Sequence, residues 1–280
     1  MKSLKPRLLT AGVGIPLILV VLYLCELWNP LITIVVGVVS AFMIGEYLGA
    51  KGLLKHYPLS VSCMLFSFAL PLVLMTAYIY ALLVAFMIIV FSVMIASHKK
   101  ISYIDLVYAL SGTLLISFGM SSLSLICRNS ASITFFFITV FALPWMADAG
   151  GFFVGATLGK HKLCPEISPK KTVEGAIGGV VFCIASALII GLIFQNLILP
   201  DMKINFWALA LLGAIDAPVS ILGDLSFSLI KRSLNIKDYG SIFPGHGGML
   251  DRFDSIIFTA PIIVIINQFL PFLSEGVNDD

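Results

Sequence analysis

The C-terminal half of the chain carries acidic, basic and hydroxyl side chains at spacings that suit phosphate and metal chemistry. Asp224, Ser228 and Lys231 lie at positions i, i+4 and i+7, so they share one face if this stretch is a helix. Lys231 would then lie about 10 Å further along the helix axis than Asp224. A carboxylate below the basic pair Lys231 and Arg232 suits a metal ion held beneath a polyphosphate. The basic pair alone is equally typical of a membrane-surface anchor.

A glycine-rich segment, residues 237–254, follows directly. Gly247 and Gly248 let the backbone approach a ligand closely and present N–H groups to phosphate oxygens. His246 lies between glycines and is a candidate phosphate donor, with a structural role as the alternative. The segment therefore predicts a phosphate-binding loop.

Two carboxylates end the same segment. Asp251 and Asp254 are three residues apart, which places them on one face if a helix begins here, with Arg252 between them. Mg²⁺ is commonly bound by one or two carboxylates together with substrate phosphates. We therefore predict that this segment contributes a metal ligand.

An earlier segment, residues 159–175, has a matching character. Its basic and hydroxyl side chains are Lys160, Lys162, Ser168, Lys170, Lys171 and Thr172. A solvated loop on the positively charged side of a membrane is the alternative interpretation. Two such segments on the same predicted face favour phosphate binding.

Carboxylates also fall inside strongly apolar stretches. These are Glu46, Asp148, Asp216 and Asp224. A charge at the centre of a membrane helix costs roughly 2.5–3.5 kcal/mol, so such residues usually face a polar cavity. A position near the membrane surface or a structural pair is the alternative, which we weigh most heavily for Glu46 and Asp216.

The composition predicts a membrane protein that must position these residues. Only 11% of the 280 residues are charged, 59% are hydrophobic and the mean hydropathy is +1.06. Soluble domains average about 25% charged residues. A net charge of +2 gives no support for a nucleic-acid partner. The five cysteines form no C-x-x-C pair, which fits neither a disulfide scaffold nor a zinc site.

We predict an all-α polytopic membrane protein with about nine transmembrane helices, since a span needs about 20 apolar residues. The expected spans are 8–28, 31–49, 59–76, 78–97, 105–127, 131–150, 175–199, 204–227 and 256–273. With the N-terminus in the cytoplasm, every Lys and Arg except Arg128 and Lys203 falls on the inside, a strong positive-inside bias. The long uncharged stretch 59–97 is divided by a tight turn near Thr76.

The two halves of the chain differ in character. Residues 1–140 are expected to be plain N-terminal transmembrane helices with short connections. Residues 141–280 are expected to form a catalytic transmembrane domain with cytoplasmic loops at about 158–174 and 231–255. We expect its cavity to open to the cytoplasm.

These residues resemble the signature of the phosphatidate cytidylyltransferase (CDP-diacylglycerol synthase) family. The match comprises Ser228, Lys231, Arg232, Lys237, Asp238, Pro244, His246, Gly247, Gly248, Asp251, Arg252 and Asp254 at fixed spacing. An upstream stretch from Ser168 to Gly175, which includes Glu174, is similar to the same family, as is Asp148. Phe152 departs from the pattern, because many relatives are expected to carry Tyr there.

The resemblance implies an enzyme that converts CTP and phosphatidic acid into CDP-diacylglycerol and pyrophosphate for phospholipid biosynthesis. It implies dependence on Mg²⁺, a multi-pass location in the cell (inner) membrane, contact with the lipid bilayer, and a possible homodimer. A related CTP-dependent lipid kinase is an alternative function. A membrane ion transporter is another, which the clustering of charge on one predicted face disfavours.

The residue roles implied by the resemblance fall into three overlapping groups. The expected metal ligands are Asp224 and Asp251. The expected catalytic residues are Asp224, Lys231, Arg232, His246, Asp251 and Asp254. The expected substrate-binding residues are Asp148, Lys160, Ser168, Lys170, Lys171, Thr172, Glu174, Ser228, Lys237, Gly247, Gly248 and Arg252.

Overall fold

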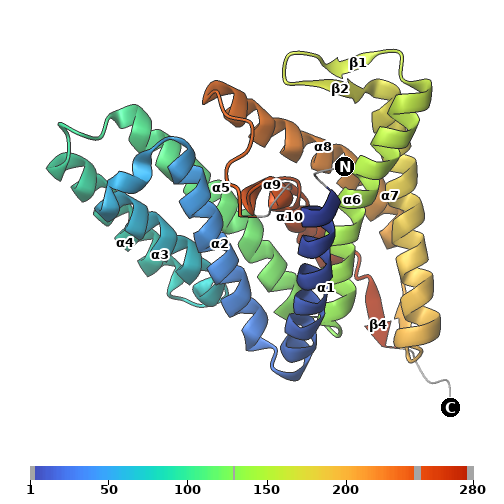
Figure 1. The fold of residues 1–280 in the computed structure, drawn as a ribbon. Coiled ribbons are helices and arrows are strands. Elements are labelled where there is room, and N and C mark those ends of the chain that lie inside the picture. The colour runs from blue at the N-terminus through green and yellow to red at the C-terminus, as the bar shows by residue number, and fades with distance from the viewer. Residues whose placement is uncertain (1–3, 129, 243–246, 276–280) are drawn as a thin grey trace. The chain divides into compact units, whose positions relative to one another are not determined.

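The computed structural model describes residues 4–128, 130–242 and 247–275, without the side chains of residues 4–11, 13 and 15. Helices dominate this part of the chain (Figure 1). The long ones are α1 (Leu4–Leu27), α2 (Pro30–Ala50), α3 (Tyr57–Val73), α4 (Ile79–Ala96), α5 (Tyr103–Arg128), α6 (Ile133–Leu158), α7 (Val173–Ile193), α8 (Phe206–Ser233) and α10 (Ile256–Phe269). Each of the nine predicted ranges overlaps one of these helices, although α6 extends eight residues beyond the predicted end at residue 150.

Six helices in the described ranges are long and apolar enough to cross a membrane, namely α2, α4, α5, α6, α7 with its π-helical extension Phe194–Ile198, and α8. The apolar part of α1, Pro16–Leu27, and the whole of α3 are shorter. This confirms a polytopic helical membrane protein, because several such apolar helices need a bilayer around them. The number of nine spans and their orientation stay predictions.

The predicted turn near Thr76 is confirmed. Helix α3 ends at Val73 and α4 begins at Ile79. The Thr76 hydroxyl donates to the Val73 carbonyl oxygen at 2.8 Å and accepts from the Tyr78 N–H at 3.2 Å. The side chain thus satisfies backbone groups that the helix end leaves free.

Two short antiparallel hydrogen-bonded pairs of strands were not predicted. β1 (Lys162–Cys164) pairs with β2 (Ser168–Thr172), and β3 (Met202–Ile204) pairs with β4 (Leu273–Glu275). The expected last span to residue 273 was too long, because α10 ends at Phe269 and the chain then enters β4. Pairing satisfies backbone groups in connections that no helix covers.

The described chain divides into two compact units. Unit 1 comprises residues 1–129 and 231–257, and unit 2 comprises residues 130–230 and 258–280. The last residues of α8 and the short helix α9 (Leu250–Phe253) therefore belong with the N-terminal helices. The compact units do not test the predicted functional division at residue 140, which stays a prediction.

In unit 1, α2 packs against α3 and α5. A side chain at Gly112 of α5 would overlap the Tyr47 ring of α2, so this glycine permits the close approach of the two helices. The Tyr47 and Tyr108 rings stack with their centroids 4.2 Å apart. The Tyr108 hydroxyl donates to the Tyr47 carbonyl oxygen at 2.8 Å. These contacts fix the face that α2 presents to the rest of unit 1.

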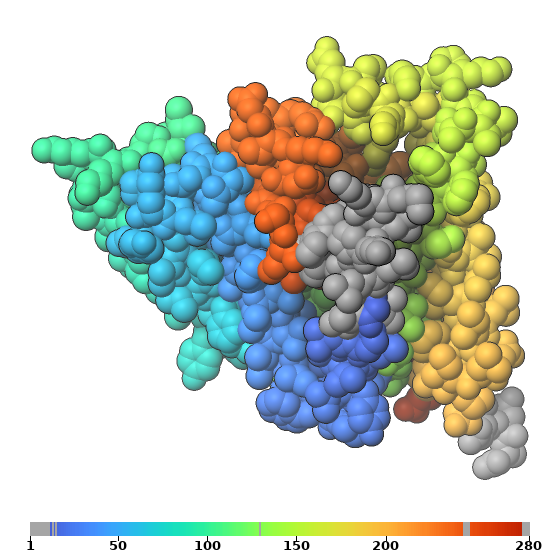
Figure 2. All heavy atoms as spheres, in the orientation of Figure 1, coloured from blue at the N-terminus to red at the C-terminus, as the bar shows by residue number. Residues whose placement is uncertain are grey.

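In unit 2, α6 packs closely along α7 through small residues. A Cβ at Gly150 would lie 2.6 Å from the Phe182 Cβ atom, and one at Gly179 would lie 2.8 Å from the Ala147 carbonyl oxygen. Such contacts are typical of membrane helices that associate through small side chains. The β1–β2 hairpin joins these two helices and projects beyond their ends (Figure 2).

Candidate functional site

The first cluster of predicted site residues lies in unit 2 around Lys171. The Lys171 Nζ atom is 2.6 Å from Oδ2 of Asp224 and 3.8 Å from Oδ1 of Asp148. The Ser228 hydroxyl donates to Oδ1 of Asp224 at 3.5 Å, as the i, i+4 spacing predicted. We call Asp148, Lys171, Asp224 and Ser228 the Lys171 cluster. It unites strand β2, helix α6 and helix α8, elements that are distant in sequence.

The β1–β2 hairpin holds Lys171 in this position. Thr172 is the N-cap of α7, and its hydroxyl oxygen accepts the Gly175 N–H at 3.1 Å. The Glu174 carboxylate accepts the Lys160 N–H at 3.0 Å and lies 2.6 Å from His161 Nδ1. Thr172 and Glu174 therefore anchor the hairpin. Their contact with a substrate phosphate stays a prediction.

The other predicted residues of this hairpin lie further toward solvent. Lys160 and Lys170 are exposed, and Ser168 is half-buried at the start of β2. Their side chains are thus accessible to an anionic ligand. Substrate contact by these three residues also stays a prediction.

The second cluster lies in unit 1 around Lys231. The Lys231 Nζ atom is 2.8 Å from Oδ1 of Asp251 and 3.9 Å from Oδ2 of Asp254. This confirms that Asp251 and Asp254 present their carboxylates to the same side of the short helix α9. The side chains of Lys231, Asp251 and Asp254 are 11%, 3% and 12% exposed. We call these three residues the Lys231 cluster.

Backbone amides complete the surroundings of Asp251. Its Oδ2 atom accepts the Tyr239 N–H at 2.8 Å and the Gly248 N–H at 3.0 Å. Gly247 has a φ of 85°, a left-handed conformation that favours glycine. A Cβ at Gly247 would also lie 3.2 Å from Oδ2 of Asp251. The Gly248 N–H that we expected to face a phosphate thus donates to Asp251, and phosphate contact by this turn stays a prediction.

The remaining predicted residues are at the surface or outside the described ranges. Arg232, Lys237 and Arg252 are exposed. His246 lies outside the described residues. Asp216, an intramembrane carboxylate in the sequence, is completely buried in α8 with the Cys183 Sγ atom 4.0 Å from its Oδ2. Asp216 is therefore part of the core of unit 2.

Glu46 and Tyr239 were not among the predicted site residues. Both Glu46 carboxylate oxygens accept backbone N–H groups of the glycine-rich segment. The Tyr239 ring lies 5.5 Å from the Lys231 Nζ atom, and burial raises the pKa of its phenol. The carboxylate inside an apolar stretch was the signal for Glu46. For Tyr239, the signal was its position beside Asp238 in the family signature.

The donor chemistry of both clusters fits a divalent cation. Asp224 and Asp251 supply carboxylate oxygens, and Asp148 and Asp254 add a second carboxylate to each cluster. The residues that the structure describes contain no group of three acidic, His or Cys ligands. Mg²⁺ does not require one, because one or two carboxylates with substrate phosphates suffice. Asp224 and Asp251 belong to different units, so their shared binding of one metal stays a prediction.

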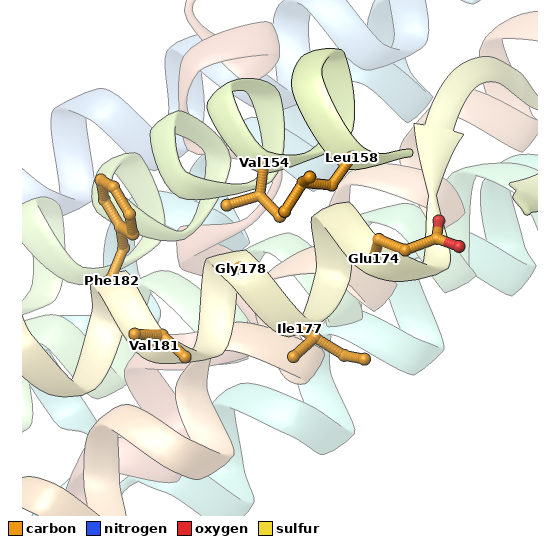
Figure 3. A pocket seen from close by; sticks show the side chains of 7 residues that line it. All are labelled: Val154, Leu158, Glu174, Ile177, Gly178, Val181 and Phe182. Carbon is orange, nitrogen blue, oxygen red and sulfur yellow. The ribbon is translucent and has the colours of Figure 1, made fainter. Parts of the chain in front are cut away.

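An apolar groove of about 320 Å³ runs along α6 and α7 in unit 2 (Figure 3). It is lined by Val154, Leu158, Glu174, Ile177, Gly178, Val181 and Phe182. The Glu174 carboxylate contacts the hairpin backbone, and the other lining residues offer only apolar surface. The apolar part of the groove therefore suits a hydrocarbon chain.

The fold and the two clusters define a class: a helical membrane protein that gathers lysines and carboxylates suited to phosphate groups and divalent cations. The chain belongs to the cytidylyltransferase family, whose sequence pattern matches residues 5–270. Similar proteins named phosphatidate cytidylyltransferase occur in Staphylococcus epidermidis at 34% identity, Staphylococcus saprophyticus at 35% and Staphylococcus aureus at 36%. Each similarity covers 184 residues, 66% of this chain and 67% of the relative.

Proposed function

We propose that this chain is an enzyme that transfers a cytidylyl group from CTP to phosphatidic acid. The products are CDP-diacylglycerol and pyrophosphate. The observation that carries the proposal is membership of the cytidylyltransferase family over residues 5–270, together with relatives named phosphatidate cytidylyltransferase. The apolar helices support a substrate that resides in the bilayer.

The reaction needs electrostatic help more than it needs a base. A phosphate oxygen of phosphatidic acid attacks the α-phosphorus of CTP, a new P–O bond forms, and the bond to the β-phosphate breaks to release pyrophosphate. The attacking group is already an anion, so no strong general base has to remove a proton. The difficulty is to bring it to a polyanion, and fixed cationic groups reduce that repulsion.

The lysines of the two clusters are suited to this task. Lys171 and Lys231 each carry an ammonium group that two carboxylates already orient. The exposed residues Lys170, Arg232 and Lys237 would extend the positive surface to the remaining phosphate oxygens. The carboxylates orient the ammonium groups, and phosphates would compete with those carboxylates for them.

We also propose that Asp224 and Asp251 hold Mg²⁺, with Asp148 and Asp254 close to it. Bound Mg²⁺ would neutralise charge on the phosphates of CTP. Replacement of Asp224 by Asn keeps the size of the side chain and removes its negative charge. We expect this change to abolish turnover, with the protein still inserted in the membrane.

The direct test uses purified protein in detergent with phosphatidic acid, Mg²⁺ and CTP labelled on its α-phosphate. Label that enters the lipid phase, and that requires both phosphatidic acid and Mg²⁺, would support cytidylyl transfer. Failure of a folded sample to label lipid would overturn it. Transfer from γ-labelled CTP would then indicate a lipid kinase, and tracer flux in vesicles would indicate a transporter.

We propose that the protein acts in the cell (inner) membrane of a bacterium, with both loop segments on the cytoplasmic side where CTP is present. The bacterial relatives support a bacterial location, and the distribution of Lys and Arg supports the orientation. The homodimer implied by the family resemblance is part of the same proposal. The mass of the detergent-solubilised protein from light scattering tests it, and a monomeric mass would contradict it.

A further inference from the structure

Glu46, on the membrane helix α2, contacts the segment that carries Asp251. Its Oε1 atom accepts the Met249 N–H at 3.0 Å, and its Oε2 atom accepts the Leu250 N–H at 2.8 Å. Leu250 is the first residue of α9, where backbone N–H groups have no partner within the helix. The Glu46 carboxylate therefore holds the chain immediately before Asp251 through two charge-assisted hydrogen bonds.

The glycines of the segment are arranged around the same carboxylate. A Cβ at Gly240 would overlap Oε1 of Glu46, and a Cβ at Gly248 would lie 2.7 Å from both Glu46 carboxylate oxygens. Neither glycine has a positive φ. These two positions need glycine because Glu46 approaches them closely, which is a different reason from the left-handed conformation of Gly247.

Aromatic contacts of α2 keep Glu46 directed at this segment. The neighbouring residue Tyr47 stacks on Tyr108 of α5 and lies 6.1 Å, ring centroid to centroid, from Tyr239. The Tyr47 hydroxyl also donates to the Tyr108 carbonyl oxygen at 3.3 Å. Since Tyr47 is buried, rotation of α2 about its axis would break this packing.

We propose that Glu46 is a positioning residue for Asp251: it clamps the Met249 and Leu250 N–H groups and so fixes the carboxylate that Lys231, Tyr239 and Gly248 surround. This gives the N-terminal helices a part in catalysis beyond membrane anchoring. The inference rests on the proposed function, in which Asp251 holds Mg²⁺. It does not require Glu46 itself to touch CTP or the lipid.

The test compares Glu46→Ala and Glu46→Gln with the matched control Glu26→Gln, which changes an exposed carboxylate on α1. Glu46→Ala should lower kcat by roughly 10- to 100-fold, the range typical of residues that orient an active-site ligand. The KM values for CTP and phosphatidic acid should change little. Glu46→Gln should recover part of the loss because its amide oxygen still accepts one N–H. The control should keep wild-type kinetics.

Hydrogen exchange supplies a readout that does not depend on turnover. The Met249 and Leu250 amides should exchange faster in Glu46→Ala than in the wild type, measured on peptides that cover residues 247–253. Unchanged exchange, a loss confined to KM, or an equal loss in Glu26→Gln would each overturn the positioning role. If the wild type transfers no cytidylyl group, the proposed function fails, and the exchange result still decides whether the clamp exists.

A double-mutant cycle probes the same contact through stability. Gly240→Ala should lower the thermal midpoint because its methyl group overlaps the Glu46 carboxylate. In the Glu46→Ala background that overlap is absent, and the nearest remaining atom is the Gly248 Cα at 3.2 Å. Gly240→Ala should therefore cost less in the double variant than alone. Additive changes in the midpoint would contradict the clamp.

Discussion

The Lys171 and Lys231 clusters share a design and differ in their surroundings. In each cluster one ammonium group lies between two carboxylates. In the Lys171 cluster the side chains of Asp148, Asp224 and Lys171 are 55%, 26% and 22% exposed, whereas those of Asp251 and Lys231 are 3% and 11% exposed. Water and ions thus reach the carboxylates of the first cluster more easily than those of the second, although the Lys171 Nζ atom itself is buried.

The source of the remaining hydrogen bonds also differs. Asp224 is contacted by the side chains of Lys171 and Ser228. Asp251 additionally receives two backbone N–H groups, which a side-chain rotation cannot withdraw. We infer that the Lys231 cluster is preorganised, while the Lys171 cluster can exchange its ammonium contacts for those of a phosphate or a cation.

The largest difference should appear between Asp251→Asn and Asp148→Asn, because Asp148 is the most exposed of the clustered carboxylates and lies 3.8 Å from its lysine. Asp251→Asn removes a nearly buried charge that three groups orient, so we expect turnover to fall by about 10²–10³-fold or more. Asp148→Asn changes a half-exposed residue 3.8 Å from Lys171, and its effect should be clearly smaller. Labelled-CTP assays on both purified variants measure this. Equal losses would show that exposure of a carboxylate does not set its contribution to turnover.

The free energy of unfolding should fall by different amounts when each of the two lysines is replaced by Met. Lys231→Met leaves Asp251 in a nearly buried position without its ammonium partner, a change that typically costs about 3–5 kcal/mol. Lys171→Met leaves Asp148 and Asp224 with partly exposed carboxylates that water can solvate, and pairs with such exposed partners are usually worth about 0–1 kcal/mol. Thermal midpoints in detergent should therefore fall much further for Lys231→Met. A larger fall for Lys171→Met would show that exposure does not set the strength of these pairs.

Salt should sharpen the same contrast. Ion pairs with solvent-exposed partners stabilise a protein less as ionic strength rises, and buried pairs are screened much less. As NaCl is raised, the difference in thermal midpoint between wild type and Lys171→Met should shrink toward zero. The difference for Lys231→Met should persist. If both differences disappeared at the same salt concentration, the two lysines would be equally screened, and the contrast between their environments would be wrong.

The sequence predicted the helices better than the connections. Apolar stretches of about 20 residues and the break near Thr76 located the helices correctly, because a bilayer requires such lengths. The β1–β2 hairpin was not predicted, since segment 159–175 has the composition of a solvated loop. Its pairing depends on contacts such as those of Glu174 with the backbone of Lys160 and His161, which composition does not encode.

The candidate site was predicted in residue type but not in its contacts. The spacing correctly placed Ser228 beside Asp224, and Asp251 beside Asp254, because these neighbours are local on a helix. The meeting of Lys171 with Asp224 joins residues that are 53 positions apart in the sequence. Glu46 is more distant still from Met249. A single sequence contains no signal for such long-range pairs, so only the structure reveals them.

The smallest effect that we predict concerns the base of the β1–β2 hairpin. Thr172 caps α7, and loss of a capping hydroxyl typically costs about 1 kcal/mol. Thr172→Ala should therefore lower the thermal midpoint slightly, and Thr172→Ser should restore it because serine keeps the acceptor oxygen.

The adjacent Lys171 would be held less firmly in Thr172→Ala, so turnover should fall by a modest factor while the buried Lys231 cluster is unaffected. If Thr172→Ala lost turnover without any change in midpoint, the hydroxyl would act on the substrate rather than on the hairpin.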